Sequence, residues 1–168
     1  MKKFSVGALS LALLLLPAFS QAPAAKPGGP QTQPQAQPKK SPLIPYAGNW
    51  IGTFENKPWL ILNLSLTGEQ FSGSLQHAHN LEIDDNGELK KVSEDFGTET
   101  VVDAKLNPDG LLLTFKDADT QETDRYMMKL TSDSTAELKM IGMSMPPGMA
   151  KPKPWKLTKY TGTPPKKQ

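Results

Sequence analysis

The sequence predicts an all-β protein: an antiparallel up-and-down β-barrel of about eight strands, preceded by a disordered N-terminal linker. Three observations lead to this fold class. Short apolar segments recur with turn residues between them, one segment alternates apolar and polar side chains with period two, and no window shows sustained helical spacing. Many short antiparallel strands close best as a small barrel, because closure removes exposed strand edges.

The first 22 residues have the pattern of a secretory signal peptide. Lys2 and Lys3 form a positively charged start, residues 4–16 are apolar, and Ser20-Gln21-Ala22 offers small residues to a signal peptidase. The alternative is a retained membrane anchor, but an apolar run this short hardly crosses a bilayer. We therefore expect a periplasmic or secreted protein with no membrane span after cleavage.

Composition divides the rest of the chain and excludes several classes of function. The 168 residues include no Cys, which excludes disulfides, thiolate metal sites, cysteine nucleophiles and a lipoprotein anchor. Residues 46–160 carry 12 basic and 17 acidic side chains, a balance that argues against nucleic-acid binding. The expected organisation is a signal peptide (1–22), a Pro/Gln-rich disordered linker (23–45), a β-barrel domain (46–160) and a disordered tail (161–168).

Turn residues separate the expected strands. The clearest strand is 59–66, where leucine occupies every second position. Asn56-Lys57 is the expected turn before it, and Asn86-Gly87 predicts a two-residue hairpin turn with positive φ at both positions. Asn107-Pro108-Asp109-Gly110 marks a further turn. The expected strands are 48–55, 59–66, 71–78, 81–84, 89–92, 98–106, 111–115, 124–131, 135–141 and 155–160.

The body of the chain opens on Gly48-Asn49-Trp50 and continues into a hairpin that ends in Phe71-Ser72-Gly73-Ser74-Leu75. This opening resembles that of calycin barrels of the lipocalin and avidin kind, and it is also similar to small secreted β-barrel modules of bacterial envelopes whose function is uncharacterised. The resemblance implies that Trp50 closes the floor of the barrel. It also implies that a basic side chain of a late strand, Lys156 or Lys159, stacks on that ring.

The two histidines of the chain, His77 and His79, are two residues apart on one expected strand and so share a face with Leu75 and Phe71. Two imidazoles on an inner wall can ligate zinc or copper, or bind the polar end of a ligand. The structural alternative is a strand end where both rings reach solvent or bond to the backbone.

Four methionines crowd the segment 140–149: Met140, Met143, Met145 and Met149. Thioethers bind copper(I), so Met143 and Met145 together with His77 and His79 form a candidate metal site. Methionine is also a flexible apolar filler, and the alternative is an adaptable lid over the barrel mouth.

The segment Glu82–Gly87 resembles a calcium-binding loop, with oxygen-bearing side chains and Gly at the sixth position. Such a loop needs Asp first and Glu twelfth, whereas this segment has Glu82 first and Ser93 twelfth. A hairpin turn explains the Asn-Gly pair by itself, and we expect the hairpin.

Catalytic patterns are missing from the sequence. We find no nucleophile-elbow sequence and no glycine-rich phosphate loop before a helix, and the acidic residues cluster at expected turns. The sequence therefore predicts a protein that is not an enzyme and takes no cofactor.

The expected function is the binding of a small apolar or amphipathic molecule in the barrel mouth. One alternative is an envelope module with a side-chain-filled barrel that binds a protein or a glycan through its loops. A second alternative is periplasmic copper or metal binding through the candidate metal site. The residues expected to line a ligand site are Trp50, Phe71, Leu75, His77, Tyr126 and Met128, with Trp50 at the floor.

Overall fold

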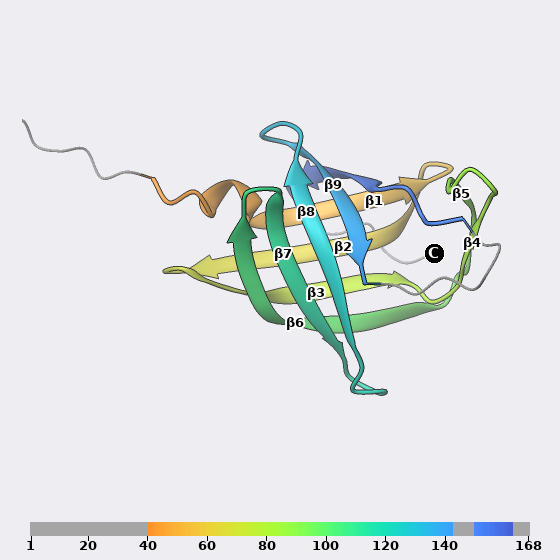
Figure 1. The fold of residues 1–168 in the computed structure, drawn as a ribbon, viewed down its shortest axis with the longest axis horizontal. Helices are drawn as coiled ribbons and strands as arrows, with labels where there is room; N and C mark the ends of the chain where they lie inside the picture. The colour runs from red at the N-terminus through yellow and green to blue at the C-terminus, as the bar shows by residue number, and fades with distance from the viewer. Residues whose placement is uncertain (1–39, 143–149, 163–168) are drawn as a thin grey trace, which may run out of the picture. The chain divides into compact units, whose positions relative to one another are not determined.

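A computed structural model describes residues 40–142 and 150–162 of the chain. Eight antiparallel strands form a closed barrel, in the order β1-β10-β9-β8-β7-β6-β3-β2, and the predicted fold class is confirmed (Figure 1). The expected signal peptide, and Met143 and Met145 of the candidate metal site, lie outside the described residues. Within the described residues, no helix is long and apolar enough to cross a membrane.

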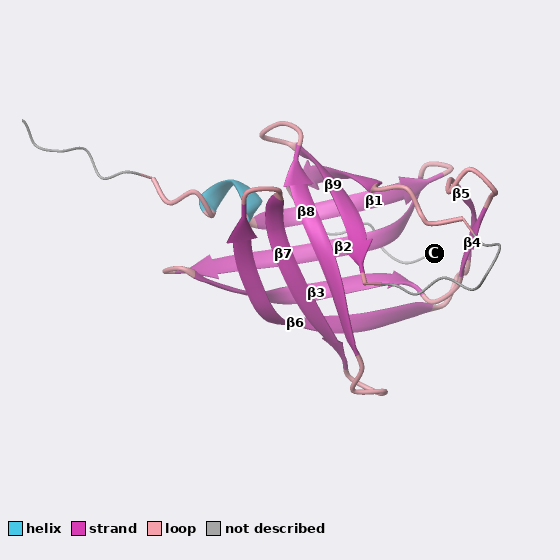
Figure 2. Cartoon of the chain, in the orientation of Figure 1, coloured by secondary structure: helices cyan, strands magenta, loops and turns pink. Residues whose placement is uncertain are grey.

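Nearly every described element is a strand (Figure 2), and every expected strand is present. Two of the strands, β4 and β5, pair with each other as a separate hairpin between β3 and β6, so that the barrel itself has eight strands. The elements are η1 (Ile44–Tyr46), β1 (Gly48–Phe54), β2 (Lys57–Thr67), β3 (Gln70–Ala78), β4 (Leu81–Ile83), β5 (Leu89–Val92), β6 (Phe96–Asn107), β7 (Gly110–Asp117), β8 (Thr123–Leu130), β9 (Thr135–Ile141) and β10 (Trp155–Tyr160).

One end of the barrel is closed by the 3-10 helix η1 and by Trp50 of β1. The Trp50 indole N–H donates a hydrogen bond to the carbonyl oxygen of Tyr46, at 3.0 Å. Lys159 of β10, one of the two candidates for the stacked cation, places its Nζ 4.9 Å from the centre of the Trp50 ring. The same Nζ donates to the carbonyl oxygen of Pro45, at 2.9 Å, and so links β10 to η1. The two hydrogen bonds hold η1 against the barrel floor, and the cation–π contact joins β10 to β1.

The interior of the barrel is filled with its own side chains, because alternate residues of each strand face inward. In β7 and β8 these are mostly Leu, Phe, Tyr and Met, and they bury apolar surface against one another. The largest fully buried side chains are Trp50, Leu60, Leu62, Leu75, Leu111, Leu113, Phe115, Tyr126, Met128, Leu138 and Leu157.

Two expected turns differ from the structure. The turn before β2 lies at Glu55-Asn56 and not at Asn56-Lys57, since Glu55 and Asn56 have positive φ and β2 already begins at Lys57. In the β4–β5 hairpin only Gly87 has positive φ, so the turn is not the expected two-residue type. The Asp84 carboxylate accepts the backbone N–H groups of Asn86 and Glu88, which stabilises a longer turn.

The opposite end of the barrel carries the β4–β5 hairpin (Figure 1). The segment before β10 crosses the tip of this hairpin. There the Lys153 backbone N–H donates to the Gly87 carbonyl oxygen at 2.8 Å, and the Lys153 Nζ lies 2.7 Å from Glu88 Oε1. Leu81, Leu89 and Val92 of the hairpin pack against the core of the barrel here. We call this end, opposite η1, the open end of the barrel.

Candidate functional site

The inner face of the barrel changes from apolar to polar at the open end. On β8, Tyr126 and Met128 are buried, and Asp124 is the next residue on their face towards the open end. On β3, His77 follows the buried Leu75 in the same way. Strand alternation therefore places polar side chains from different strands between the apolar core and the open end. We call this polar layer the mouth of the barrel.

His77 and Glu99 form a hydrogen-bonded pair at this level. His77 lies on β3 opposite Gly97 of β6, and Glu99 is two residues along on the inner face of β6. The His77 Nε2 is 2.7 Å from Glu99 Oε1, and Glu99 is only 4% exposed. The His77 Nδ1–H donates to the carbonyl oxygen of Ala78, at 2.9 Å.

These contacts define where the proton of the pair sits. Because a carbonyl oxygen only accepts hydrogen bonds, Nδ1 of His77 carries a hydrogen, and a second proton lies between Nε2 and Glu99. Burial lowers the pKa of His77, but the hydrogen bonds to Glu99 and Ala78 outweigh this effect and raise it above the usual value of 6.5. The pair is therefore a charge-assisted hydrogen bond near neutral pH.

The raised pKa of His77 predicts that stability depends on pH. The folded chain holds this proton more tightly than the unfolded chain, so the stabilisation is complete below pH 6.5 and is lost as pH rises through the folded pKa. We expect the free energy of unfolding to fall as the pH rises from 6.5 through the folded pKa of His77. Urea denaturation across this range measures it, with His77→Gln as the comparison; identical pH profiles for the two proteins would contradict the prediction.

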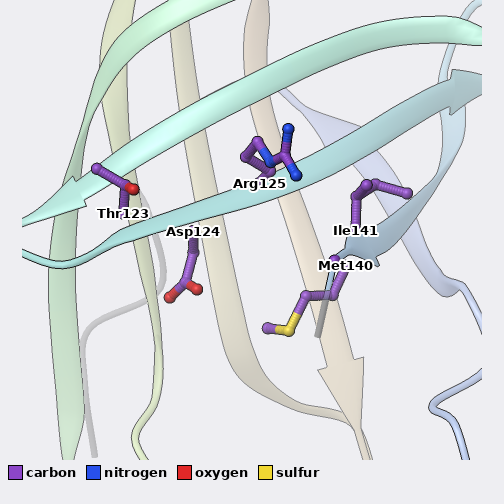
Figure 3. A pocket seen from close by; sticks show the side chains of 6 residues that line it. Thr123, Asp124, Arg125, Met140 and Ile141 are labelled. Atoms are coloured by element: carbon purple, nitrogen blue, oxygen red, sulfur yellow. The ribbon is translucent and has the colours of Figure 1, made fainter. Parts of the chain in front are cut away.

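A cleft of about 520 Å³ lies at the rim of the open end, where β8 begins and β9 ends (Figure 3). Asp124 and Met140 point to one side of the two strands, and Arg125 and Ile141 point to the other. The cleft thus combines charged groups with an apolar thioether. Its lining residues are Thr123, Asp124, Arg125, Met140, Ile141 and Gly142.

Asp124 connects the cleft with the buried pair electrostatically. Asp124 is exposed, but partial desolvation raises the pKa of its carboxyl group. The negative charge of Glu99 raises this pKa further, and the positive charge of His77 opposes both effects. Burial, with the charges of Glu99 and Asp124, also raises the pKa of the neighbouring Tyr126 phenol, which stays neutral. Glu99, Asp124 and His77 therefore interact with one another at the mouth.

A second cleft, of about 300 Å³, lies beside the β4–β5 hairpin. Its aromatic wall is formed by Trp59 and Trp155, whose rings meet edge to face with centres 5.0 Å apart. Lys153 and Glu88, which are paired with each other, form part of its polar wall. Lys156 also lines this cleft and belongs to no ion pair among the described residues, so the second cleft combines an aromatic surface with a positive charge.

The structure separates the residues expected to line a ligand site. Trp50, Leu75, Tyr126 and Met128 are fully buried in the core, and none of them lines either cleft. Phe71 is half-buried and packs against the core from the closed half of β3. Of the expected set, His77 alone belongs to the polar layer at the mouth.

The candidate metal site is only partly described. His79 is exposed beyond the end of β3, and its ring lies over Gly97 of β6. Both ring nitrogens of His77 are already within hydrogen-bonding distance of Glu99 and Ala78. Among the residues that the structure describes, no group of three or more His, Asp or Glu side chains is placed to hold a metal ion.

Two residues of the mouth, Glu99 and Asp124, were not expected from the sequence. Glu99 stands in an expected strand, where alternation places it with Gly97 and Val101 on one face. A charged residue on a strand usually indicates the face of the sheet that is exposed to solvent. Glu99 instead lies on the inner face of the barrel and is buried. Only the pairing of β3 with β6 shows that the Glu99 carboxylate lies beside His77.

Comparison of the chain with protein-family models, with curated protein sequences and with solved structures finds no match. The chemistry of the mouth is therefore the basis on which a function can be proposed.

Proposed function

We propose that this protein is a non-enzymatic binding protein that takes a small amphipathic molecule at the open end of its barrel. The observation that carries the proposal is the rim cleft, in which the Asp124 carboxylate and the Met140 side chain share one side. Concave sites that combine an apolar surface with a few polar groups are the usual binding places for small ligands.

The site is expected at the rim and not deep in the barrel. The interior below the His77–Glu99 pair is occupied by fully buried side chains such as Phe115 and Tyr126. A ligand that entered this region would have to displace close-packed atoms, which costs stability. The ligand therefore contacts the mouth with its polar group and the rim with its apolar part.

Fluorescence titration with the apolar probe N-phenyl-1-naphthylamine tests the proposal. We expect saturable binding, and we expect Met140→Ala to weaken it about three- to tenfold, since apolar contact area is lost. Leu106→Ala is the control, because Leu106 is a partly exposed apolar residue on β6 near the closed end. Failure of the probe to saturate, or equal affinity of Met140→Ala and the parent protein, would contradict the proposal.

A second candidate function is an interaction module that binds a protein or a glycan. The filled interior favours this function, because a module of this kind needs no ligand cavity. The aromatic wall formed by Trp59 and Trp155 is the surface that supports it, since aromatic side chains are enriched where proteins bind partners.

We also propose that the protein acts in the periplasm or outside the cell. The support for this proposal is the sequence pattern of residues 1–22: two lysines, an apolar run and small residues at the end.

A further inference from the structure

Only one of the two oxygens of the buried Glu99 carboxylate has a hydrogen-bond partner among the described residues. Its Oε1 bonds to His77, but its Oε2 is buried and has no hydrogen-bond partner among the described residues. A buried oxygen without a partner loses its hydration and gains nothing in return, so such atoms are rare in native proteins. A hydrogen-bond donor supplied by a ligand would satisfy it.

The groups around Glu99 are mostly acidic. Asp117 of β7 is the direct neighbour of Glu99 in the β6–β7 pair. Asp124 of β8 pairs with Phe115, which is two residues before Asp117 on β7, and its charge interacts with that of Glu99. His77 of β3 supplies one positive charge, and Tyr126 of β8 is neutral. His79 also lies near this group, with its ring over Gly97 and within electrostatic reach of Asp117. With two histidines among three carboxylates, acidic groups still predominate, and the mouth favours cations over anions.

The nearest basic side chain of the cleft does not neutralise Asp124. Arg125 follows Asp124 on β8, and the two side chains point to opposite sides of the strand (Figure 3). In the described part of the chain, neither residue belongs to an ion pair. The Asp124 carboxylate therefore remains available to a ligand at the inner side of the cleft.

We propose that the mouth recognises a protonated primary amine, with the ammonium group bound by Asp124 in the cleft and directed towards the buried Glu99 Oε2 below it, and with the apolar chain lying along Met140. This inference rests on the proposed function and names the chemical class of the ligand. An ammonium group has three N–H donors and a positive charge, which matches two carboxylates, one of them an acceptor without a partner. An alcohol of the same length lacks the charge, and a fatty acid has the wrong one.

Isothermal titration calorimetry at pH 7 with three probes of equal chain length tests the proposal: octylamine, octan-1-ol and octanoate. We expect octylamine to bind about tenfold or more tightly than octan-1-ol, because hydrogen bonds to charged groups are the strong ones. Octanoate is expected to bind more weakly than both. Equal affinity for octylamine and octan-1-ol would overturn the assignment of an amine.

Single-residue variants test whether Asp124 and Glu99 cause the preference for octylamine. Asp124→Asn and Glu99→Gln are each expected to reduce octylamine affinity about tenfold while leaving octan-1-ol affinity nearly unchanged. Arg125→Gln changes a charge of the same cleft and is expected not to weaken octylamine. If Glu99→Gln does not fold, Asp124→Asn still decides the question, since Asp124 lies at the rim; unchanged octylamine affinity in that variant would overturn the proposal.

The outcomes separate this inference from the proposed function. If octan-1-ol binds and Met140→Ala weakens it, but octylamine binds no better, the proposed function stands and the amine assignment is wrong. If none of the three probes binds, both are wrong.

Discussion

Replacing His77 by Ala is expected to lower the free energy of unfolding by about 3 kcal/mol at pH 7, because the change leaves the Glu99 carboxylate buried without a partner. Glu99 is almost completely buried, and His77 is the one side chain to which it is hydrogen-bonded in the described chain. Urea denaturation of the variant and the parent protein measures the difference.

Two comparison variants show whether the buried charge is the cause. His79→Ala removes the exposed histidine two residues away and is expected to change stability by less than about 0.5 kcal/mol. The double variant His77→Leu/Glu99→Leu removes both polar groups and is expected to recover most of the loss, because an apolar pair has no charge to desolvate. A double variant as unstable as His77→Ala would show that packing and not charge explains the effect.

Replacing Phe115 by Ala is expected to lower the free energy of unfolding by about 3–5 kcal/mol. Phe115 of β7 is fully buried, and its ring meets Tyr126 edge to face with centres 5.6 Å apart. The change removes this aromatic contact and leaves a cavity that strands closed into a barrel cannot easily collapse. Thermal or urea denaturation provides the measurement.

Phe71→Ala is the matched control for this experiment. Phe71 of β3 packs against the core but remains partly exposed, so its replacement removes less buried area. We expect it to cost clearly less stability than Phe115→Ala. If the two variants lost equal stability, the burial of Phe115 would not explain the destabilisation of Phe115→Ala.

The strands and the barrel could be predicted from the sequence because their signals are local. In residues 59–66 the alternating leucines define a face, and turn residues such as Asn107-Pro108-Asp109-Gly110 define where strands end. The details of the turns could not be predicted in the same way. In the β4–β5 hairpin the Asp84 side chain bonds to the backbone and selects a longer turn than Asn86-Gly87 suggested.

The candidate site was predictable only in part. His77 could be predicted as a candidate because the chain has only two histidines and because His77 shares a strand face with Leu75. The methionine-rich segment 140–149 begins with Met140, which lies near the end of β9 and lines the rim cleft. The sequence predicts Asp124 as an ordinary solvated residue near a turn. The structure does leave Asp124 exposed, but at the rim cleft.

Local patterns in the sequence thus determined the class of fold and the positions of its strands, since alternation and turn chemistry act over a few residues. Only the tertiary structure decided what lies at the mouth. Glu99 is 22 residues from His77 along the chain, and Asp124 reaches the same end from a strand that is separated from β6 by β7. Strand pairing and barrel closure bring these charges together, and no pattern within a single strand records which neighbours its inner face will meet.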